Sequence, residues 1–214
     1  MGIYFNPLNK GFESSLRSDI YVDKSGIISY TNKVLGTQRK YVCVSRPRRF
    51  GKTMAADMLS AYYNRAHTSE KMFSDLAISK DDSYKEHMNN YDVIHLNMQD
   101  FLGESNSIDE MIKNIIESIA EDISDIYPQL NRYISKGRFI AAFTSLFVIT
   151  GTPIIFIIDE WDCIFREFKT DLNAQKIYLD FLRTLLKDKQ YVGLVYMTGI
   201  LPIKKYGWML IGAK

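Results

Sequence analysis

The run Ile154–Ile158 constrains the fold more than any other segment, because every residue in it is apolar and it offers no polar face. A strand of this kind has to be buried on both faces. Largely apolar runs at Tyr41–Val44 and Tyr191–Met197 predict two more buried strands, and Val93–Met98 predicts a shorter one. Amphipathic helical patterns separate these runs. The sequence therefore predicts an α/β fold with a mostly parallel sheet sandwiched by helices.

The spacing of apolar residues predicts three long helices between and after these strands. The first begins at Ser107, which forms a capping box with Glu110 and precedes a stripe of isoleucines that ends before Pro128. In such a box we expect each of the two side chains to accept a hydrogen bond from the other residue's backbone N–H. The other two helices include Phe139 and Ala174 near their starts.

Composition and sequence signals indicate a protein of a reducing compartment without a membrane span. The 27 basic and 25 acidic residues leave a net charge of +2, which favours no class of partner. Cys43 and Cys163 lie in or beside apolar runs and are expected to be free thiols. The charge-free window Phe139–Ile158 is long enough for a bilayer, but Gly151-Thr152-Pro153 divides it into a helix and a strand. We therefore expect a cytoplasmic location.

At 214 residues the chain is the size of one domain with a small addition. Glycines punctuate the first part of the sequence, which we expect to form a lead-in of residues 1–36 packed on the core. Residues 37–214 would then form the core domain.

A short basic loop after the first strand has the elements of a phosphate-binding site. Gly51-Lys52-Thr53 follows the Tyr41 strand and opens a helix. A P-loop at this place supplies backbone N–H groups and a lysine to the phosphates and a hydroxyl to magnesium. The usual first glycine is replaced by Arg46, and Pro47 has no N–H to donate, but Arg48 and Arg49 add positive charge. The alternative is a basic surface loop with a structural glycine.

The Ile154 strand ends in two acidic residues, Asp159 and Glu160. In phosphoryl transfer, an aspartate at a strand end holds magnesium with the P-loop hydroxyl, and a nearby carboxylate polarises water. Since neighbouring strand residues point in opposite directions, the two carboxylates are expected to serve these separate roles. The alternative is an ordinary acidic turn. Between the two motifs there is room for the Val93 strand and two crossover units, which suits a P-loop sheet with an extra strand between the two motif strands.

A polar residue, Thr198, ends the Tyr191 strand. It is expected either to contact the γ-phosphate or the attacking water, or to cap the last backbone groups of that strand. Tyr21 and Trp161 are candidates for stacking on adenine, although packing in the core is the more frequent role of large aromatic residues.

Four segments in this order resemble the bacterial AAA-ATPase-like family: Tyr21–Ser25, Ser45–Thr53, Ile157–Asp162 and Thr198–Leu201. The Arg-Pro-Arg-Arg-Phe-Gly-Lys string, a variant Walker A motif, is the most specific of these. The resemblance implies a P-loop NTPase core of the catalytic-glutamate, AAA-like type that binds ATP and Mg²⁺. Members often carry a nuclease-like domain after this core.

The two motifs and the resemblance together give a set of predicted site residues. Glu160, Lys52 and Thr198 are expected to act in catalysis, and Thr53 and Asp159 to hold magnesium. The predicted nucleotide-binding residues are Arg46, Pro47, Arg48, Arg49, Phe50, Gly51, Lys52 and Thr53.

The end of the sequence departs from the family pattern, because the chain stops soon after the Thr-Gly segment, at Tyr206–Lys214. We expect the last strand, the helical lid and the nuclease-like domain to be missing. The leading hypothesis is Mg-dependent ATP hydrolysis. The alternatives are a catalytically impaired module that binds nucleotide or nucleic acid, as a truncated ATPase fragment would, and a helicase-like acidic box. A nucleic-acid or protein partner and an oligomer are left open.

Overall fold

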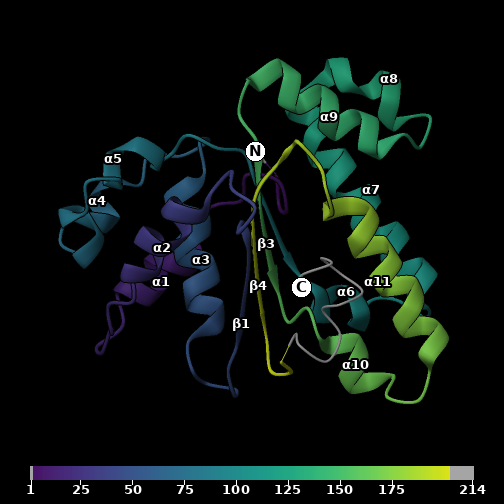
Figure 1. Ribbon diagram of the computed structural model, residues 1–214, viewed down its shortest axis with the longest axis horizontal. Helices are drawn as coiled ribbons and strands as arrows, with labels where there is room; N and C mark the ends of the chain where they lie inside the picture. The colour runs from purple at the N-terminus through teal and green to yellow at the C-terminus, as the bar shows by residue number, and fades with distance from the viewer. Residues whose placement is uncertain (1, 203–214) are drawn as a thin grey trace.

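A four-stranded parallel sheet forms the centre of the computed structural model, which describes residues 2–202 (Figure 1). Its strands are β1 (Tyr41–Ser45), β2 (Val93–Asn97), β3 (Ile154–Asp159) and β4 (Val192–Gly199). They lie in the order β1-β4-β3-β2, and every neighbouring pair is parallel. The predicted α/β class and the four predicted strands are confirmed.

The order of the strands places β4 between the two motif strands, β1 and β3. A strand does lie between the motif strands, as expected, but it is not the Val93 strand for which the sequence leaves room between the motifs. That strand is the last of the four in sequence, whereas the Val93 strand, β2, lies outside β3 at the other edge of the described sheet.

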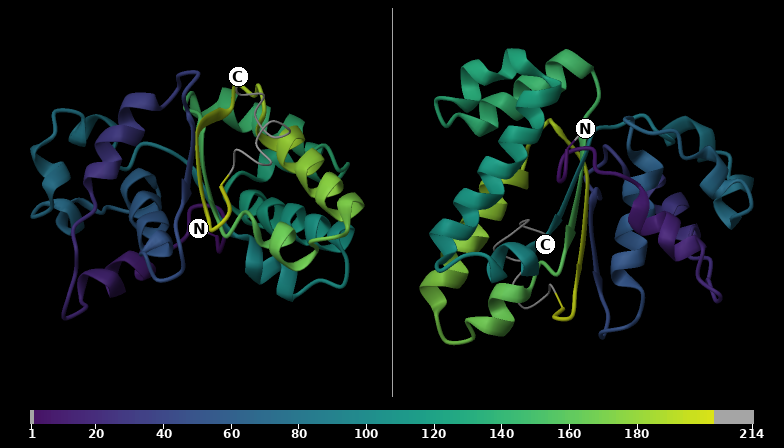
Figure 2. Two further views of the ribbon diagram at one scale, coloured as in Figure 1. Left: turned by 60° about the horizontal axis from the view of Figure 1, so that its bottom comes forward. Right: turned by 180° about the vertical axis from the view of Figure 1, so that it is seen from behind.

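Two layers of helices cover the two faces of the sheet (Figures 1 and 2). One layer contains α1 (Lys10–Leu16), α2 (Gly26–Val34), α3 (Lys52–Tyr63), α4 (Glu70–Phe73), a 3-10 turn (Ala77–Lys80) and α5 (Tyr84–His87). The other contains α6 (Met98–Gly103), α7 (Ile108–Ile126), a 3-10 turn (Pro128–Leu130), α8 (Asn131–Ile134), α9 (Phe139–Thr150), α10 (Cys163–Glu167) and α11 (Leu172–Leu186).

Each face of the sheet has its own apolar core, and β3 contributes to both. Ile155 and Ile157 pack in the core beneath α3, whereas Phe156 packs on the opposite side, against Phe143 and Tyr191. Every residue of β3 is buried. This two-sided burial is why the strand reads as an unbroken apolar run.

Helix α7 begins at the predicted cap but forms a shifted version of the predicted capping box. Ser107 Oγ accepts a hydrogen bond from the Glu110 backbone N at 3.1 Å, as expected. The Glu110 carboxylate, however, accepts from the backbone N of Asn106 at 2.7 Å, not from that of Ser107. The Glu110 side chain thus reaches past Ser107 and fixes the backbone of Asn106, the residue before the cap. The helix ends before Pro128, as predicted.

The charge-free window divides where the sequence predicted. Its first part is α9, Gly151 ends that helix at φ 68°, and its second part is β3. Among residues 2–202, no helix is both long and apolar enough to cross a bilayer. Cys43 and Cys163 are free thiols, as expected.

The amino-terminal segment contacts both layers. Phe5 forms an isolated antiparallel bridge with Ile94 of β2, and the fully buried Phe12 of α1 stacks on Phe73. The Asp122 carboxylate of α7 accepts hydrogen bonds from two backbone N–H groups of this segment, those of Tyr4 and Phe5. The expectation for Tyr206–Lys214 concerns residues outside the described part of the chain.

Candidate active site

The predicted site residues meet at the carboxyl ends of the strands, at the lower end of the sheet in Figure 1. In open α/β sheets ligands bind outside these ends. A cleft of about 550 Å³ opens here, and its lining residues are Arg48, Arg49, Gly51, Lys52, Thr53, Met54, Asn97, Gln99, Asp159, Glu160, Arg166 and Glu167. The basic loop, the end of β3 and α10 thus form the walls of one cleft.

The basic loop turns sharply before α3, and two residues in it have left-handed backbone conformations. Arg49 has φ +67° and Gly51 has φ +71°. The loop is held from two sides, because Lys24 Nζ donates to the Phe50 carbonyl at 2.9 Å and the Arg46 N–H donates to the Gly199 carbonyl at 3.0 Å. The turn places Lys52 and the amino end of α3 at the cleft, where a helix has a partial positive charge.

The structure joins the two motifs directly. Thr53 Oγ1 donates a hydrogen bond to Asp159 Oδ2 at 2.6 Å. Thr198 Oγ1 donates to the other oxygen of the same carboxylate, Asp159 Oδ1. Thr198 is completely buried and does not line the cleft, so it contacts the predicted magnesium ligand from behind. Its hydroxyl neither caps the strand backbone nor faces the cleft, the two roles expected from the sequence.

Glu160 lies beside Asp159 in the cleft, but the reason is not strand alternation. Strand β3 ends at Asp159, and Glu160 has a left-handed backbone with φ +50°. This turn brings both carboxylates to the same cleft, so the expectation that they point in opposite directions is wrong. One Glu160 oxygen lies 3.8 Å from Lys52 Nζ, and the other accepts a hydrogen bond from Arg166 at 2.6 Å.

The sequence motifs identified Glu160 but not Arg166, nor the contacts of Arg166 with Gln99 and Asp162. Arg166 Nη2 also donates to Gln99 Oε1 at 3.2 Å, and its Nε lies 3.6 Å from Asp162 Oδ1. Asp162 precedes the short helix α10 and Arg166 lies in its last turn, four residues later, a spacing that brings side chains together. That spacing was a usable signal for this pair, but the contact with Gln99 joins distant parts of the chain.

Three predicted nucleotide-binding residues lie outside this cleft. Arg46 and Phe50 line a neighbouring hollow of about 440 Å³ that shares Gly51 and Lys52 with the cleft. Pro47 contributes its carbonyl, which accepts a hydrogen bond from Lys52 Nζ at 3.3 Å. Some residues of the basic loop therefore line the cleft, and others line the neighbouring hollow.

The two aromatic candidates for adenine stacking have packing roles. Trp161 is completely buried and its ring lies 5.5 Å from that of Phe165. Tyr21 donates from its hydroxyl to Met58 Sδ at 3.9 Å and packs against Phe12. Both side chains thus serve the core.

Two titratable groups, Asp57 of α3 and His95 of β2, lie behind the cleft. Burial, and then the charge of Asp159, raises the pKa of Asp57 to about 6. Burial lowers the pKa of His95 to about 4. His95 Nδ1 lies 4.0 Å from Asp57 Oδ1. Near neutral pH these shifts leave an ionised carboxylate beside a neutral imidazole.

The donor set at the cleft suits a magnesium ion that is bound together with a phosphate. Within residues 2–202, no group of three or more His, Cys, Asp or Glu side chains is arranged to hold a metal. Mg²⁺ usually takes one or two carboxylates and completes its shell with water and substrate phosphates. The adjacent Thr53 hydroxyl and Asp159 carboxylate fit that requirement.

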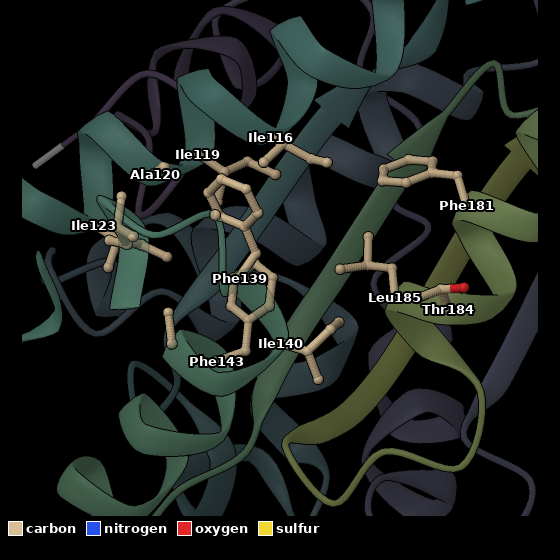
Figure 3. A pocket seen from close by; sticks show the side chains of 13 residues that line it. Ile116, Ile119, Ala120, Ile123, Phe139, Ile140, Phe143, Phe181, Thr184 and Leu185 are labelled. Carbon is tan, nitrogen blue, oxygen red and sulfur yellow. The ribbon is translucent and has the colours of Figure 1, made fainter. Parts of the chain in front are cut away.

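A second cavity, away from the cleft, is apolar. It has a volume of about 190 Å³ and lies between α7, α9 and α11, with Ile119, Phe143 and Leu185 among its walls (Figure 3). Thr184 is a polar residue among its walls, and its hydroxyl points away from the apolar side chains in Figure 3. This chemistry can accept an apolar group but cannot bind phosphate.

Comparison with curated proteins and with solved structures found no match. A family model described as a predicted AAA-ATPase matches residues 12–209, which include the basic loop, the acidic strand end and Thr198. This match confirms the resemblance seen in the sequence. The chain therefore belongs to the AAA-ATPase-like family, whose members are predicted AAA-ATPases.

Proposed function

We propose that this chain binds ATP with Mg²⁺ at the cleft and hydrolyses it. The observation that carries the proposal is the 2.6 Å hydrogen bond between Thr53 of the basic loop and Asp159 of β3. It brings the hydroxyl and the carboxylate of two distant motifs to one point, beside Lys52 and Glu160. A basic surface loop and an unrelated acidic turn would not require that contact.

In the proposed reaction each residue has a distinct task. Lys52 and the backbone N–H groups at the start of α3 bind the outer phosphates, and Arg48 and Arg49 add positive charge at the rim of the cleft. Glu160 orients the attacking water and accepts its proton. Thr198 fixes the Asp159 carboxylate through its hydroxyl. With these tasks, the proposed enzyme is of the catalytic-glutamate, AAA-like type.

Thr53 and Asp159 would hold the metal ion. When bound, Mg²⁺ supplies positive charge that neutralises the charge developing on the phosphate oxygens. The Thr53 hydroxyl could ligate the metal through an oxygen lone pair while its proton still donates to Asp159.

The test measures ATP binding by calorimetry and phosphate release on the same samples, with and without magnesium. The variants are Lys52→Ala and Glu160→Gln, and the control is Lys113→Ala, which removes an exposed lysine of α7 far from the cleft in sequence. We expect Lys52→Ala to lose binding and release, and Glu160→Gln to bind but not release. Lys113→Ala should behave as wild type.

Other outcomes would separate the alternatives. Binding without release by the wild type would refute hydrolysis and support a nucleotide-binding module. Absence of ATP binding would refute the site. Binding of single-stranded nucleic acid that weakens steeply with salt and does not respond to Asp159→Asn would favour the nucleic-acid alternative.

A further inference from the structure

Arg166 is the most highly connected cation at the cleft, and neither motif contains it. Its side chain is 14% exposed. It donates to Glu160 Oε2 at 2.6 Å and to Gln99 Oε1 at 3.2 Å. Its Nε lies 3.6 Å from Asp162 Oδ1. Both hydrogen bonds come from Nη2, and the Asp162 carboxylate lies at the Nε side of the group, so the contacts restrict the planar guanidinium at two places.

Asp162 connects Arg166 to the strand that ends in Thr198. Its side chain is completely buried, and its Oδ2 accepts hydrogen bonds from the backbone N–H groups of Ile200 at 2.9 Å and Leu201 at 2.7 Å. These residues directly follow β4. The end of β4 therefore reaches Asp159 through the Thr198 hydroxyl and reaches Glu160 through Asp162 and Arg166.

A bound nucleotide would affect the two cations beside Glu160, Lys52 and Arg166, in different ways. Lys52 Nζ lies 3.8 Å from Glu160 Oε1, whereas Arg166 contacts the other oxygen at 2.6 Å. Under the proposed function, Lys52 binds phosphate and so leaves its contact with Glu160. Arg166 does not have to move, because Gln99 and Asp162 hold it in place.

We propose that Arg166 is a positioning residue that holds the Glu160 carboxylate in place once Lys52 has bound phosphate. This inference rests on the proposed function, because it concerns the orientation of the group that acts on water. Arg166 acts through Glu160 and makes no contact with the phosphates. Its removal should therefore lower the rate of hydrolysis while leaving the affinity for nucleotide unchanged.

The experiment compares kcat for phosphate release with the calorimetric Kd for Mg-ATP in the full chain. The variants are Arg166→Ala and Arg166→Lys, and both are also made in the Glu160→Gln background. The control is Arg183→Ala, which removes another arginine that pairs with a carboxylate, Asp180 of α11, at 2.7 Å. Single-turnover measurements with radiolabelled ATP give the low rates of the Glu160→Gln variants.

Misplacing a reacting group by an ångström costs on the order of 100-fold in rate, so we expect Arg166→Ala to lower kcat by about 10- to 100-fold with Kd within about twofold of wild type. Arg166→Lys should lower kcat less than Arg166→Ala, because an ammonium group can still pair with Glu160. Its kcat should stay below that of the wild type, because the ammonium group cannot also hold Gln99 and Asp162. In the Glu160→Gln background, Arg166→Ala should change the rate by less than about twofold, since residues that act as a unit are not additive. Arg183→Ala should leave kcat and Kd unchanged.

Several outcomes would overturn the inference. A wild-type kcat in Arg166→Ala would show that Glu160 needs no such support. If Arg166→Ala lowers the affinity for Mg-ATP as much as it lowers kcat, Arg166 contacts the phosphates. If Arg166→Ala lowers the rate as much in the Glu160→Gln background as in the wild type, Arg166 acts independently of Glu160. If Arg166→Ala does not fold, an Arg166→Lys variant that folds and has wild-type kcat refutes the inference on its own. Absence of hydrolysis by the wild type would instead refute the proposed function, and the inference with it.

Discussion

A pair of glycine substitutions separates backbone strain from the function of the basic loop. Gly51 lies in the loop and Gly36 precedes β1, and both have φ +71°. A left-handed backbone costs an L-residue about 1–2 kcal/mol. Alanine returns about 0.4–1 kcal/mol of this by stiffening the unfolded chain. Gly51→Ala and Gly36→Ala should therefore each lower the free energy of unfolding by about 1 kcal/mol, or about 2–4 °C in Tm for a chain of this size.

The surroundings of the two added Cβ atoms differ. At Gly36 a Cβ meets no atom within 4 Å, whereas at Gly51 it lies 2.8 Å from Lys24 Nζ. Gly51→Ala should displace the Lys24 ammonium, which donates to the Phe50 carbonyl and holds the loop. Since the Lys24 side chain is flexible, it can move away from the added methyl group at little cost in stability. The loop then loses its contact with Lys24, so the main effect should be a change in loop conformation. We expect Mg-ATP affinity to fall at least about tenfold, or 1.4 kcal/mol, in Gly51→Ala.

Urea titration gives the two stabilities and calorimetry gives the two affinities. The reasoning predicts similar losses of stability for both variants and a loss of affinity for Gly51→Ala alone. Equal affinities of the two variants would refute the assignment of this turn to phosphate binding. A loss of affinity in Gly36→Ala would show that general destabilisation is enough to disturb the cleft.

Three further predictions concern stability. Because burial and Asp159 raise the pKa of Asp57 to about 6, ionising Asp57 costs folding free energy as pH rises from its ordinary value of 3.8 through 6. Asp57→Asn should thus be more stable than wild type above pH 6, with a gain that shrinks toward pH 3.8 in urea titrations across this range. Phe156→Ala should cost about 3–5 kcal/mol in the same assay because it empties a fully buried position, whereas Ile20→Ala, at an 83% exposed position, should change stability by less than about 0.5 kcal/mol. Asp162→Ala leaves the backbone N–H groups of Ile200 and Leu201 without their acceptor and removes the carboxylate that lies 3.6 Å from Arg166 Nε, so it should cost about 3–5 kcal/mol; a loss below about 1 kcal/mol would contradict the role given to this buried carboxylate.

The sequence predicted the four strands and the longer helices α3, α7, α9 and α11, because their signals are local, but it did not predict the shorter helices. The apolar run of β3 and the capping residues of α7 act through neighbours a few positions away, so each could be recognised in isolation. The extra strand between β1 and β3 was inferred from the room for the Val93 strand, whereas the structure places β4 there. Pairing depends on contacts between distant segments, which no local pattern contains.

The candidate site shows the same division between local and distant information. The glycine, lysine and threonine of the loop and the two acids of β3 could be selected as motifs, and the structure brings Thr53 and Asp159 together. The left-handed turn at Glu160 and the burial of Thr198 could not be foreseen, because both depend on how the end of β3 packs against β4. Arg166 could be linked to Asp162 by helical spacing, but its contact with Gln99 exists only in the folded chain.

The strand order also bears on how the chain folds as it is synthesised. Strand β1 pairs with β4, the last described strand, and β3 pairs with it on the other side. While the ribosome is still adding residues before Val192, β1 has no described partner in the sheet, and β4 does not yet join β1 and its loop to β3. The long chain segment between β1 and β4 has to be closed before this pairing forms, which makes folding slower than in a sheet of sequence neighbours. The cleft can therefore take shape only after β4 has been synthesised, and until then exposed strand edges make the nascent chain prone to aggregation.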